Sequence, residues 1–377
     1  MDLSFSKEDD AFRQAARAWL EAHVPSSPLP SGDTREGFTQ HLAWERALFD
    51  AGWAVVAWPR AYGGRDATLM QWLIFEEEYW RAGAPQRVTQ NGVFLLAPTI
   101  FTFGTQAQKD RLLKPIAAAE CLWAQGWSEP GAGSDLAALL SKAVRVDGGF
   151  RLYGQKTWTT RGAFCDKIFG PFRTEESGPA HAGLTYFLVP LHAEGVSVRG
   201  AARLDGDEGF ADVFLDGVFV PDEDVLGGVG NGWKVAMSTT SSERALSLRA
   251  PGRFLATAER LRALCLQSPR GADPVLRDRV VRAIIDAEAY RFHTFALATK
   301  MQNGVELGPE ASLSKLFWSE MDVSMHETAL ALLGEAAELE NAWTKQYQFA
   351  LAGPIYAGTN EIQKNVVAER VLGLPRK

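Results

Sequence analysis

The feature that most limits the possible folds is a hydrophobic pattern that changes twice along the chain. Up to about residue 119, apolar residues recur at the spacing of amphipathic helices. From Cys121 to about Asn231, short runs rich in Val, Phe, Leu and Thr alternate with turn residues, as in β-strands. Long helical patterns then return. This order predicts an α+β protein with an N-terminal helical domain at residues 1–119, a central β domain at 120–231 and a C-terminal helical domain at 232–377.

Local signals place individual elements within this order. Ser6 is expected to cap a first helix whose apolar face includes Phe12. The residues Asp-Gly-Gly at 147–149 separate two strand-like runs and predict a hairpin turn. Pro251 is expected to kink a helix or to mark its boundary. Further helices are expected near residues 38–51, 70–80, 94–103, 107–118, 233–266, 275–302, 309–338 and 360–371, and strands near 186–189 and 213–215.

Composition excludes several classes of protein. The formal net charge of −7 over 377 residues argues against a surface that binds nucleic acid broadly. The three cysteines, Cys121, Cys165 and Cys265, show neither a disulfide pattern nor zinc-ligand spacing, which favours a reducing compartment. The N-terminus lacks the basic start and apolar core of a signal peptide, and no apolar run approaches a membrane span. We therefore expect a cytoplasmic protein that binds neither nucleic acid nor membranes.

The stretch with the most chemical information is Trp-Ser-Glu-Pro-Gly-Ala-Gly-Ser-Asp at residues 127–135. Its glycines and proline predict a tight loop that a large ligand can approach closely, with the hydroxyls of Ser128 and Ser134 beside it. Three further motifs follow it: Gly-Gln-Lys-Thr-Trp-Thr-Thr at 154–160, Ser-Glu-Arg-Ala at 242–245 and Ile-Tyr-Ala-Gly-Thr-Asn-Glu-Ile-Gln at 355–363. In this order and spacing, the four motifs resemble the acyl-CoA dehydrogenase family of flavoproteins, and the resemblance covers nearly the whole chain.

The resemblance implies a β-barrel-like central domain, a C-terminal helical bundle and an FAD cofactor. A flavin requires a flat apolar wall, hydrogen bonds at its ring edge and groups that hold its pyrophosphate. The family positions imply that Trp158 lies against the isoalloxazine ring, that Thr160 bonds near its reactive nitrogen and that Ser128 bonds its pyrimidine edge. The other implied contacts are Gln125, Trp127, Gly133, Ser134, Thr359 and Glu361 for FAD, and Ser134 and Arg244 for the acyl-CoA substrate. Without the resemblance, Trp158 is a core residue on a strand, and a helix capped by Thr359 or Asn360 follows a turn at Gly358.

Oxidation of a thioester between Cα and Cβ also requires a base for the α-proton, while a hydride leaves for flavin N5. A carboxylate suits this role because loss of water beside the flavin raises its pKa. Many family members place this Glu in a Tyr-Glu-Gly-Thr motif, where this chain has Ala357. A branch with isovaleryl- and long-chain-type members places it on a central helix directly before an Arg, where Glu243 precedes Arg244. We therefore predict that Glu243 is the base; the alternative is a solvated helix residue.

The leading hypothesis is an FAD-dependent acyl-CoA dehydrogenase that passes electrons to an electron-transferring flavoprotein. It is expected to form a homodimer, a homotetramer or a heterotetramer with a paralogous subunit. Two alternatives stay open: a non-catalytic partner subunit, and a flavin monooxygenase on the same fold. The absence of a Gly-x-Gly-x-x-Gly fingerprint disfavours a nicotinamide enzyme.

The sequence does not determine the acyl chain of the substrate or whether Arg270 contacts FAD. The sequence resembles a subgroup that includes pimeloyl-CoA-type and steroid-catabolic enzymes, without identifying the acyl chain. Many family members carry an Arg-x-x-Phe-Gly element that binds the FAD of a neighbouring subunit. This chain has Pro-Arg-Gly-Ala-Asp-Pro at 269–274, so a contact of Arg270 with FAD is undecided.

Overall fold

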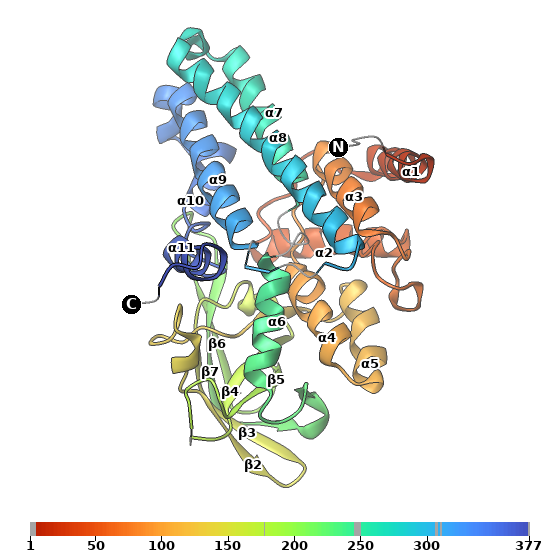
Figure 1. Cartoon of the computed structure of the whole chain (residues 1–377), viewed down its shortest axis with the longest axis vertical. Helices are drawn as coiled ribbons and strands as arrows, with labels where there is room; N and C mark the ends of the chain where they lie inside the picture. Colours follow the sequence, from red (N-terminus) through yellow and green to blue (C-terminus); the bar gives the residue numbers. More distant parts are fainter. Residues whose placement is uncertain (1–4, 177, 245–249, 306–307, 310, 376–377) are drawn as a thin grey trace. The chain divides into compact units, whose positions relative to one another are not determined.

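The computed structural model describes residues 5–176, 178–244, 250–305, 308–309 and 311–375, with the backbone alone at 241–244. The chain divides into two compact units (Figure 1). The helical unit combines Met1–Ser26, Ala67–Ala84 and Arg244–Lys377, and the sheet unit combines Ser27–Asp66 and Pro85–Glu243. Helical N-terminal and C-terminal regions enclose a central sheet region in the sequence, which confirms the predicted fold class. The predicted three-domain limits stay a prediction.

The helical unit has an apolar core. Its helices are α1 (Lys7–His23), α3 (Leu69–Arg81), α7 (Gly252–Gln267), α8 (Pro274–Gln302), α9 (Ala311–Leu333), α10 (Ala342–Ala350) and α11 (Asn360–Val366), with short 3-10 or π segments at Pro269–Ala272, Gly334–Glu338 and Val367–Val371. α7, α8 and α9 lie side by side (Figure 1). Phe254, Tyr290 and Trp318 are buried where they meet. Burial of such side chains, at roughly 1.5–3 kcal/mol each, stabilises the bundle.

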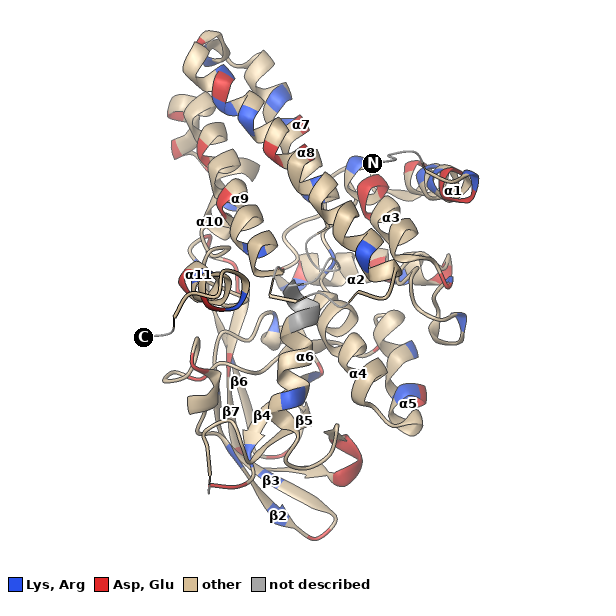
Figure 2. Ribbon diagram, viewed as in Figure 1, with Lys and Arg blue, Asp and Glu red and all other residues tan. Residues whose placement is uncertain are grey.

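Buried charge joins the first helix to this bundle. Ser6 caps α1 as predicted, since its hydroxyl accepts from the Asp9 amide at 3.1 Å. Glu78 of α3 forms ion pairs with Arg13 and Arg17 of α1, both at 2.9 Å. Burial opposes the charge of Glu78, but the guanidinium groups of Arg17, Arg13 and Arg81 outweigh it and lower its pKa to about 2. In Figure 2, residues of both charges are interspersed along the helices of this unit.

The sheet unit contains eight strands and several helices. The strands are β1 (Trp123–Gln125), β2 (Lys142–Val146), β3 (Gly149–Lys156), β4 (Lys167–Arg173), β5 (Leu184–Pro190), β6 (Val196–Ala201), β7 (Phe210–Pro221) and β8 (Val225–Leu226). They follow the order β6-β7-β3-β2-β4-β5-β8, and β1 pairs with β4. The α-helices of this unit are α2 (Arg35–Asp50), α4 (Ala97–Phe103), α5 (Gln106–Ala117) and α6 (Gly232–Arg244). The last residue of α6, Arg244, belongs to the helical unit. The sheet unit also contains a π-helix at Asn91–Leu96 and 3-10 turns at Arg60–Tyr62, Leu136–Ala138, Gly162–Phe164 and Asp222–Asp224.

Local predictions agree with the structure in most places. β2 and β3 form the predicted hairpin, with Val146 opposite Gly149 and Gly148 at φ +72°. Pro251 marks a helix boundary, since it is the N-cap of α7, so the helix expected at 233–266 is two helices. α10 was not predicted. It has nine residues, and its start depends on the Asn341 side chain, which caps it.

Candidate functional site

The loop after β1 begins inside the sheet core and ends at the surface. Gln125, the last residue of β1, is half-buried, and Trp127 is buried. The indole N–H of Trp127 donates to the Tyr186 hydroxyl at 3.1 Å. Ser128 is half-buried, and its carbonyl accepts from the Thr157 amide at 2.8 Å. The loop is therefore joined to the second motif by its backbone.

The middle of this loop is a tight turn, as the sequence predicts. Glu129 and Ala132 exchange two backbone hydrogen bonds of 2.9 and 3.0 Å around Pro130 and Gly131. A Cβ added at Gly131 or Gly133 would meet nothing within 4 Å. Ser134 is exposed. The outer side of the loop is thus open, and a large ligand can approach its backbone closely.

A buried ion pair fixes the base of the loop. The ammonium of Lys156 is 2.9 Å from Oε1 of Glu129, and the Lys156 side chain is 0% exposed. Lys156 also donates to the carbonyl oxygens of Trp127 at 3.3 Å and Pro171 at 3.0 Å. Burial lowers the pKa of Lys156, and the charge of Glu129 opposes this effect. This pair was not predicted from the sequence. Strand alternation could have indicated it, because Lys156 lies an even number of residues after the buried Phe150 of β3 and therefore points to the same face of the sheet.

The second motif presents Trp158 to the outside. Trp158 is 66% exposed and lies in the left-handed region at φ +54°. The neighbouring Thr159 is buried and exchanges two backbone hydrogen bonds of 3.0 and 3.1 Å with Ala211, and Thr160 is half-buried. Edge-on contact with Phe210, at a centroid distance of 5.5 Å, supports one side of the indole ring. A left-handed non-glycine residue costs on the order of 1–2 kcal/mol, and such strain persists where the surrounding bonds over-determine it. Trp158 is therefore a presented side chain and not a core residue.

The fourth motif forms a turn and a helix start in the helical unit. Thr359 is the N-cap of α11 and accepts from the Ile362 amide at 3.3 Å, so the cap is Thr359 and not the alternative, Asn360. Ala357 before it has φ +57°. Glu361 is exposed in the first turn, where its own backbone amide and the Thr359 hydroxyl lower the pKa of its carboxyl group. At position 357 the turn offers a methyl group and no carboxylate.

Neutral amides and one buried lysine stabilise this turn. The side-chain amide of Gln363 donates to the carbonyl oxygens of Ala357 at 3.0 Å and Gly358 at 3.2 Å. Asn360 accepts from the buried ammonium of Lys315 at 2.7 Å. The first turn of α11 is therefore attached to α9.

The third motif lies at the end of α6. Glu243 and Arg244 belong to its last turn, and their side chains lie outside the described residues. Thr239, one turn before Glu243, is buried and lies 2.8 Å from the Thr99 hydroxyl and 3.5 Å from the Tyr186 hydroxyl. Because Tyr186 also bonds Trp127, a polar chain through the core of the sheet unit connects α6 to the loop after β1.

Comparison with known proteins follows the same division of the sequence. Models of the N-terminal, middle and C-terminal domains of acyl-CoA dehydrogenases match residues 6–120, 124–218 and 230–372. Acyl-CoA dehydrogenase IpdE1 of Mycobacterium tuberculosis is 37% identical over 98% of both chains. The chain belongs to the acyl-CoA dehydrogenase family. It is therefore an oxidoreductase, and its cofactor is FAD.

Solved structures of this family have the same fold. The Tcur3481-Tcur3483 steroid ACAD is 27% identical over the whole of both chains, with a TM-score of 0.89. The ChsE4-ChsE5 complex from Mycobacterium tuberculosis is 26% identical over the whole of both chains, with a TM-score of 0.85. Among the helices described for this acyl-CoA dehydrogenase, none combines the length and apolar character needed to cross a membrane. The cytoplasmic location stays a prediction.

The residues of the sheet unit fit an FAD group. The exposed indole of Trp158 offers a flat apolar face, and the open backbone at Gly131 and Gly133 leaves room for a bulky ligand. Ser128 and Thr160 place hydroxyl groups next to these features in the sequence, with Ser128 tied to Thr157 by a backbone bond. The shape and the chemical groups of these sheet-unit residues therefore suit an FAD molecule.

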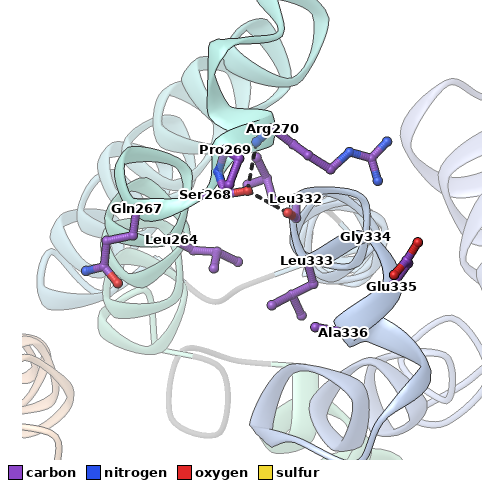
Figure 3. Close-up of a pocket in the computed structure, with 10 residues that line it drawn as sticks. All are labelled: Leu264, Gln267, Ser268, Pro269, Arg270, Leu332, Leu333, Gly334, Glu335 and Ala336. Carbon is purple, nitrogen blue, oxygen red and sulfur yellow. Dashed lines mark hydrogen bonds between the residues drawn. The ribbon is translucent and has the colours of Figure 1, made fainter.

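Arg270 lies at a surface hollow of about 530 Å³ in the helical unit (Figure 3). Its backbone amide donates to the Ser268 hydroxyl at 3.1 Å, and that hydroxyl donates to the Leu332 carbonyl at 2.7 Å. Its guanidinium extends over Gly334, with the Glu335 carboxylate at the rim. The segment is thus a capped 3-10 turn and lacks the Arg-x-x-Phe-Gly element, so contact of Arg270 with FAD stays undecided.

Proposed function

We propose that this acyl-CoA dehydrogenase oxidises an acyl-CoA thioester between Cα and Cβ, with Glu243 as the base. The α-carbon gives a proton to the Glu243 carboxylate, the β-carbon loses a hydride, and the Cα–Cβ double bond forms. When bound, FAD supplies the hydride acceptor at N5. The proposal rests on one structural observation: Trp158 is an exposed, flat side chain on a segment whose Thr157 amide is hydrogen-bonded to the open glycine loop at Ser128.

The proposed roles of this chain's residues follow from their chemistry. Trp158 provides an apolar wall for the flavin, and Ser128 and Thr160 bond its ring edge. Arg244 and Ser134 hold the acyl-CoA substrate. The remaining proposed FAD contacts are Gln125, Trp127, Gly133 and Ser134 in the sheet unit, and Thr359 and Glu361 in the helical unit. Trp127 contributes its backbone, since its side chain is buried against Tyr186.

The choice of base depends on position 357. Ala357 cannot accept a proton, and the left-handed turn around it contains no substitute carboxylate before Glu361. Glu243 is the remaining family position for the base. A carboxylate that loses water beside a flavin and an acyl chain binds its proton more tightly, which matches a general base to a weakly acidic C–H group.

We propose a bulky, polycyclic acyl-CoA as the substrate class, supported by the steroid ACAD among the similar structures. Heteromeric assembly with a paralogous subunit is supported in the same way, because the ChsE4-ChsE5 structure is a complex of two named chains. A homodimer or homotetramer is the other assembly. The electron acceptor is proposed to be an electron-transferring flavoprotein, as the family resemblance implies.

Anaerobic flavin bleaching by a panel of acyl-CoA thioesters tests the reaction and the substrate class. In stopped-flow measurements, Glu243→Gln should retain FAD and bind the best thioester. Its rate of flavin reduction should fall about 10²–10⁴-fold, the usual contribution of a general base. Glu223→Gln removes an exposed carboxylate on the 3-10 turn after β7 and serves as the control. Reduction of the Glu243→Gln flavin at the wild-type rate contradicts the assignment.

A non-catalytic partner subunit is the second candidate, and two observations favour it. Position 357 carries Ala, and residues 269–274 lack the element that completes a neighbouring FAD site. In that case the chain purifies without FAD. In a complex with its catalytic partner, Glu243→Gln then leaves flavin reduction unchanged.

A further inference from the structure

A cluster of buried and half-buried charges lies in the sheet unit, and one of its members, Arg161, directly follows the second motif. Asp33, just before α2, is 2.6 Å from Nε of Arg161 and 2.5 Å from Nη1 of Arg203. Arg203 also pairs with Asp205 at 2.7 Å. Asp33 and Arg161 are only 6% and 3% exposed. One buried carboxylate therefore joins a buried guanidinium group, that of Arg161, to a half-buried one, that of Arg203.

This cluster is bonded to the backbone that presents Trp158. Arg161 follows Trp158 by three residues, also has a left-handed φ (+56°), and its amide donates to the Gly209 carbonyl at 3.0 Å. The Arg203 guanidinium passes so close to Gly209 that a Cβ there would lie 2.6 Å from Nη1. Phe210, the next residue, touches the Trp158 ring. Asp33 thus acts on both partners of that ring contact, through Arg161 on one side and Arg203 on the other.

We infer that Asp33 is a positioning residue for the flavin-binding loop at residues 157–161. Its carboxylate holds Arg161 and Arg203, and through them it holds the strained backbone that keeps the Trp158 ring in place for FAD. The inference rests on the proposed function, in which Trp158 contacts the flavin ring. Asp33 itself touches neither FAD nor the substrate in this assignment.

The electrostatics of Arg161 explain why the loop depends on Asp33. Among the described residues, Nη1 of Arg161 is buried without a hydrogen-bond partner, and Asp33 is the carboxylate that pairs with this guanidinium. Without that carboxylate, a buried cation is left uncompensated, which costs far more than the pair contributes. The contact that ties residue 161 to Asp33 is lost as well, whether or not the cation is also removed. The left-handed conformation of Trp158 then lacks this support, and strained conformations persist only where the surroundings enforce them.

The test compares three variants of the full chain. Asp33→Asn removes the charge and keeps the shape. Asp33→Asn with Arg161→Met removes both charges, so that no buried cation is stranded. Asp224→Asn is the matched control: Asp224 is also buried and pairs with Arg111 at 2.5 Å in the same unit, away from the loop. The measurements are the Kd for FAD of the FAD-free protein, hydrogen exchange of the peptide at 157–164, and the chemical unfolding midpoint.

The inference expects a weakening of FAD affinity of at least tenfold and faster exchange at 157–164 in Asp33→Asn. Asp224→Asn loses stability but keeps the wild-type Kd within about twofold, a difference of less than roughly 0.5 kcal/mol. The double variant regains stability while its FAD affinity stays low. The inference is overturned if Asp33→Asn matches Asp224→Asn in Kd and exchange, or if the double variant regains both stability and affinity.

Trp158→Ala separates this inference from the proposed function. If it binds FAD as tightly as the wild type, the flavin assignment is wrong, and the exchange measurement still shows whether Asp33 orders the loop. If Asp33→Asn does not fold, the double variant carries the decision. A wild-type Kd in a folded double variant then overturns the positioning role.

Discussion

Two segments are proposed to contact FAD: residues 157–161 of the sheet unit and 357–363 of the helical unit. Both hold a strained backbone conformation, but different interactions stabilise it in each. Each contains a non-glycine residue in the left-handed region, Trp158 at φ +54° and Ala357 at φ +57°. The first segment is surrounded by buried pairs of opposite charge. The second is held by side-chain amides and one buried ammonium.

The difference corresponds to what each segment presents. Trp158 exposes a large ring. If the backbone under this ring moves, the ring loses its orientation and its contact with Phe210, so we expect a rigid backbone at this position. Ala357 presents only a methyl group, and the residues of use in its segment are the cap Thr359 and the exposed Glu361. Charge pairs in a low-dielectric interior are costly to break, whereas amide hydrogen bonds contribute about 1 kcal/mol each. The comparison predicts large effects in the first segment and graded effects in the second.

The largest effect is expected at Lys156. Lys156→Met leaves the buried carboxylate of Glu129 without its cation, although the amides of Leu140 at 2.6 Å and Ser141 at 3.0 Å still donate to it. Loss of one partner of a buried ion pair costs about 3–5 kcal/mol, which chemical unfolding of the FAD-free protein will measure. Lys142→Met, at an exposed position of β2, should leave the unfolding midpoint unchanged. If Lys156→Met and Lys142→Met change the unfolding midpoint equally, the buried ion pair does not stabilise the segment at 157–161, and the proposed difference from the segment at 357–363 is wrong.

A smaller effect is expected at Asn360. Asn360→Ala removes the acceptor that lies 2.7 Å from the Lys315 ammonium and 3.1 Å from the Ser319 hydroxyl. A hydrogen bond to a charged group is worth about 1.5–3 kcal/mol, so the unfolding free energy should fall by that amount. Asn360→Asp sharpens the comparison, because it converts the contact into an ion pair like those of the sheet unit. It should lose less stability than Asn360→Ala. A larger loss would show that repulsion from the Glu320 carboxylate, to which the Asn360 amide donates at 3.3 Å, outweighs the new ion pair.

Sequence patterns predicted the elements that depend on local chemistry. The cap at Ser6, the hairpin at 147–149 and the tight loop at 127–135 follow from side chains within a few residues of each structure. The order of helical and strand-like regions follows from apolar periodicity. Family resemblance, and not periodicity, supplied FAD as the cofactor.

Features that depend on distant partners were missed. Periodicity treats Lys156 and Lys315 as surface residues, yet both are buried beside partners 27 and 45 residues away. The pairing of Asp33 with Arg161 has no local signature, and neither does the union of residues 67–84 with the C-terminal helices in one unit. A positive φ at Trp158 also leaves no trace in residue type, since a tryptophan is by default assigned to the core. The assignment of Glu243 as the base stays a prediction from the sequence.

The smallest effect is expected at Ala357, and its sign is the opposite of the others. Ala357→Gly relieves the left-handed conformation, so the unfolding free energy should rise by up to about 1 kcal/mol, since the lost strain exceeds the entropy that glycine gains in the unfolded chain. Ala18→Gly, at an exposed position inside α1, is the matched control and should lose about 0.5–1 kcal/mol. FAD affinity should not change in Ala357→Gly, because the methyl group has no proposed contact. A loss of stability or of FAD affinity would mean that the strain at Ala357, like that at Trp158, holds a side chain in a required position.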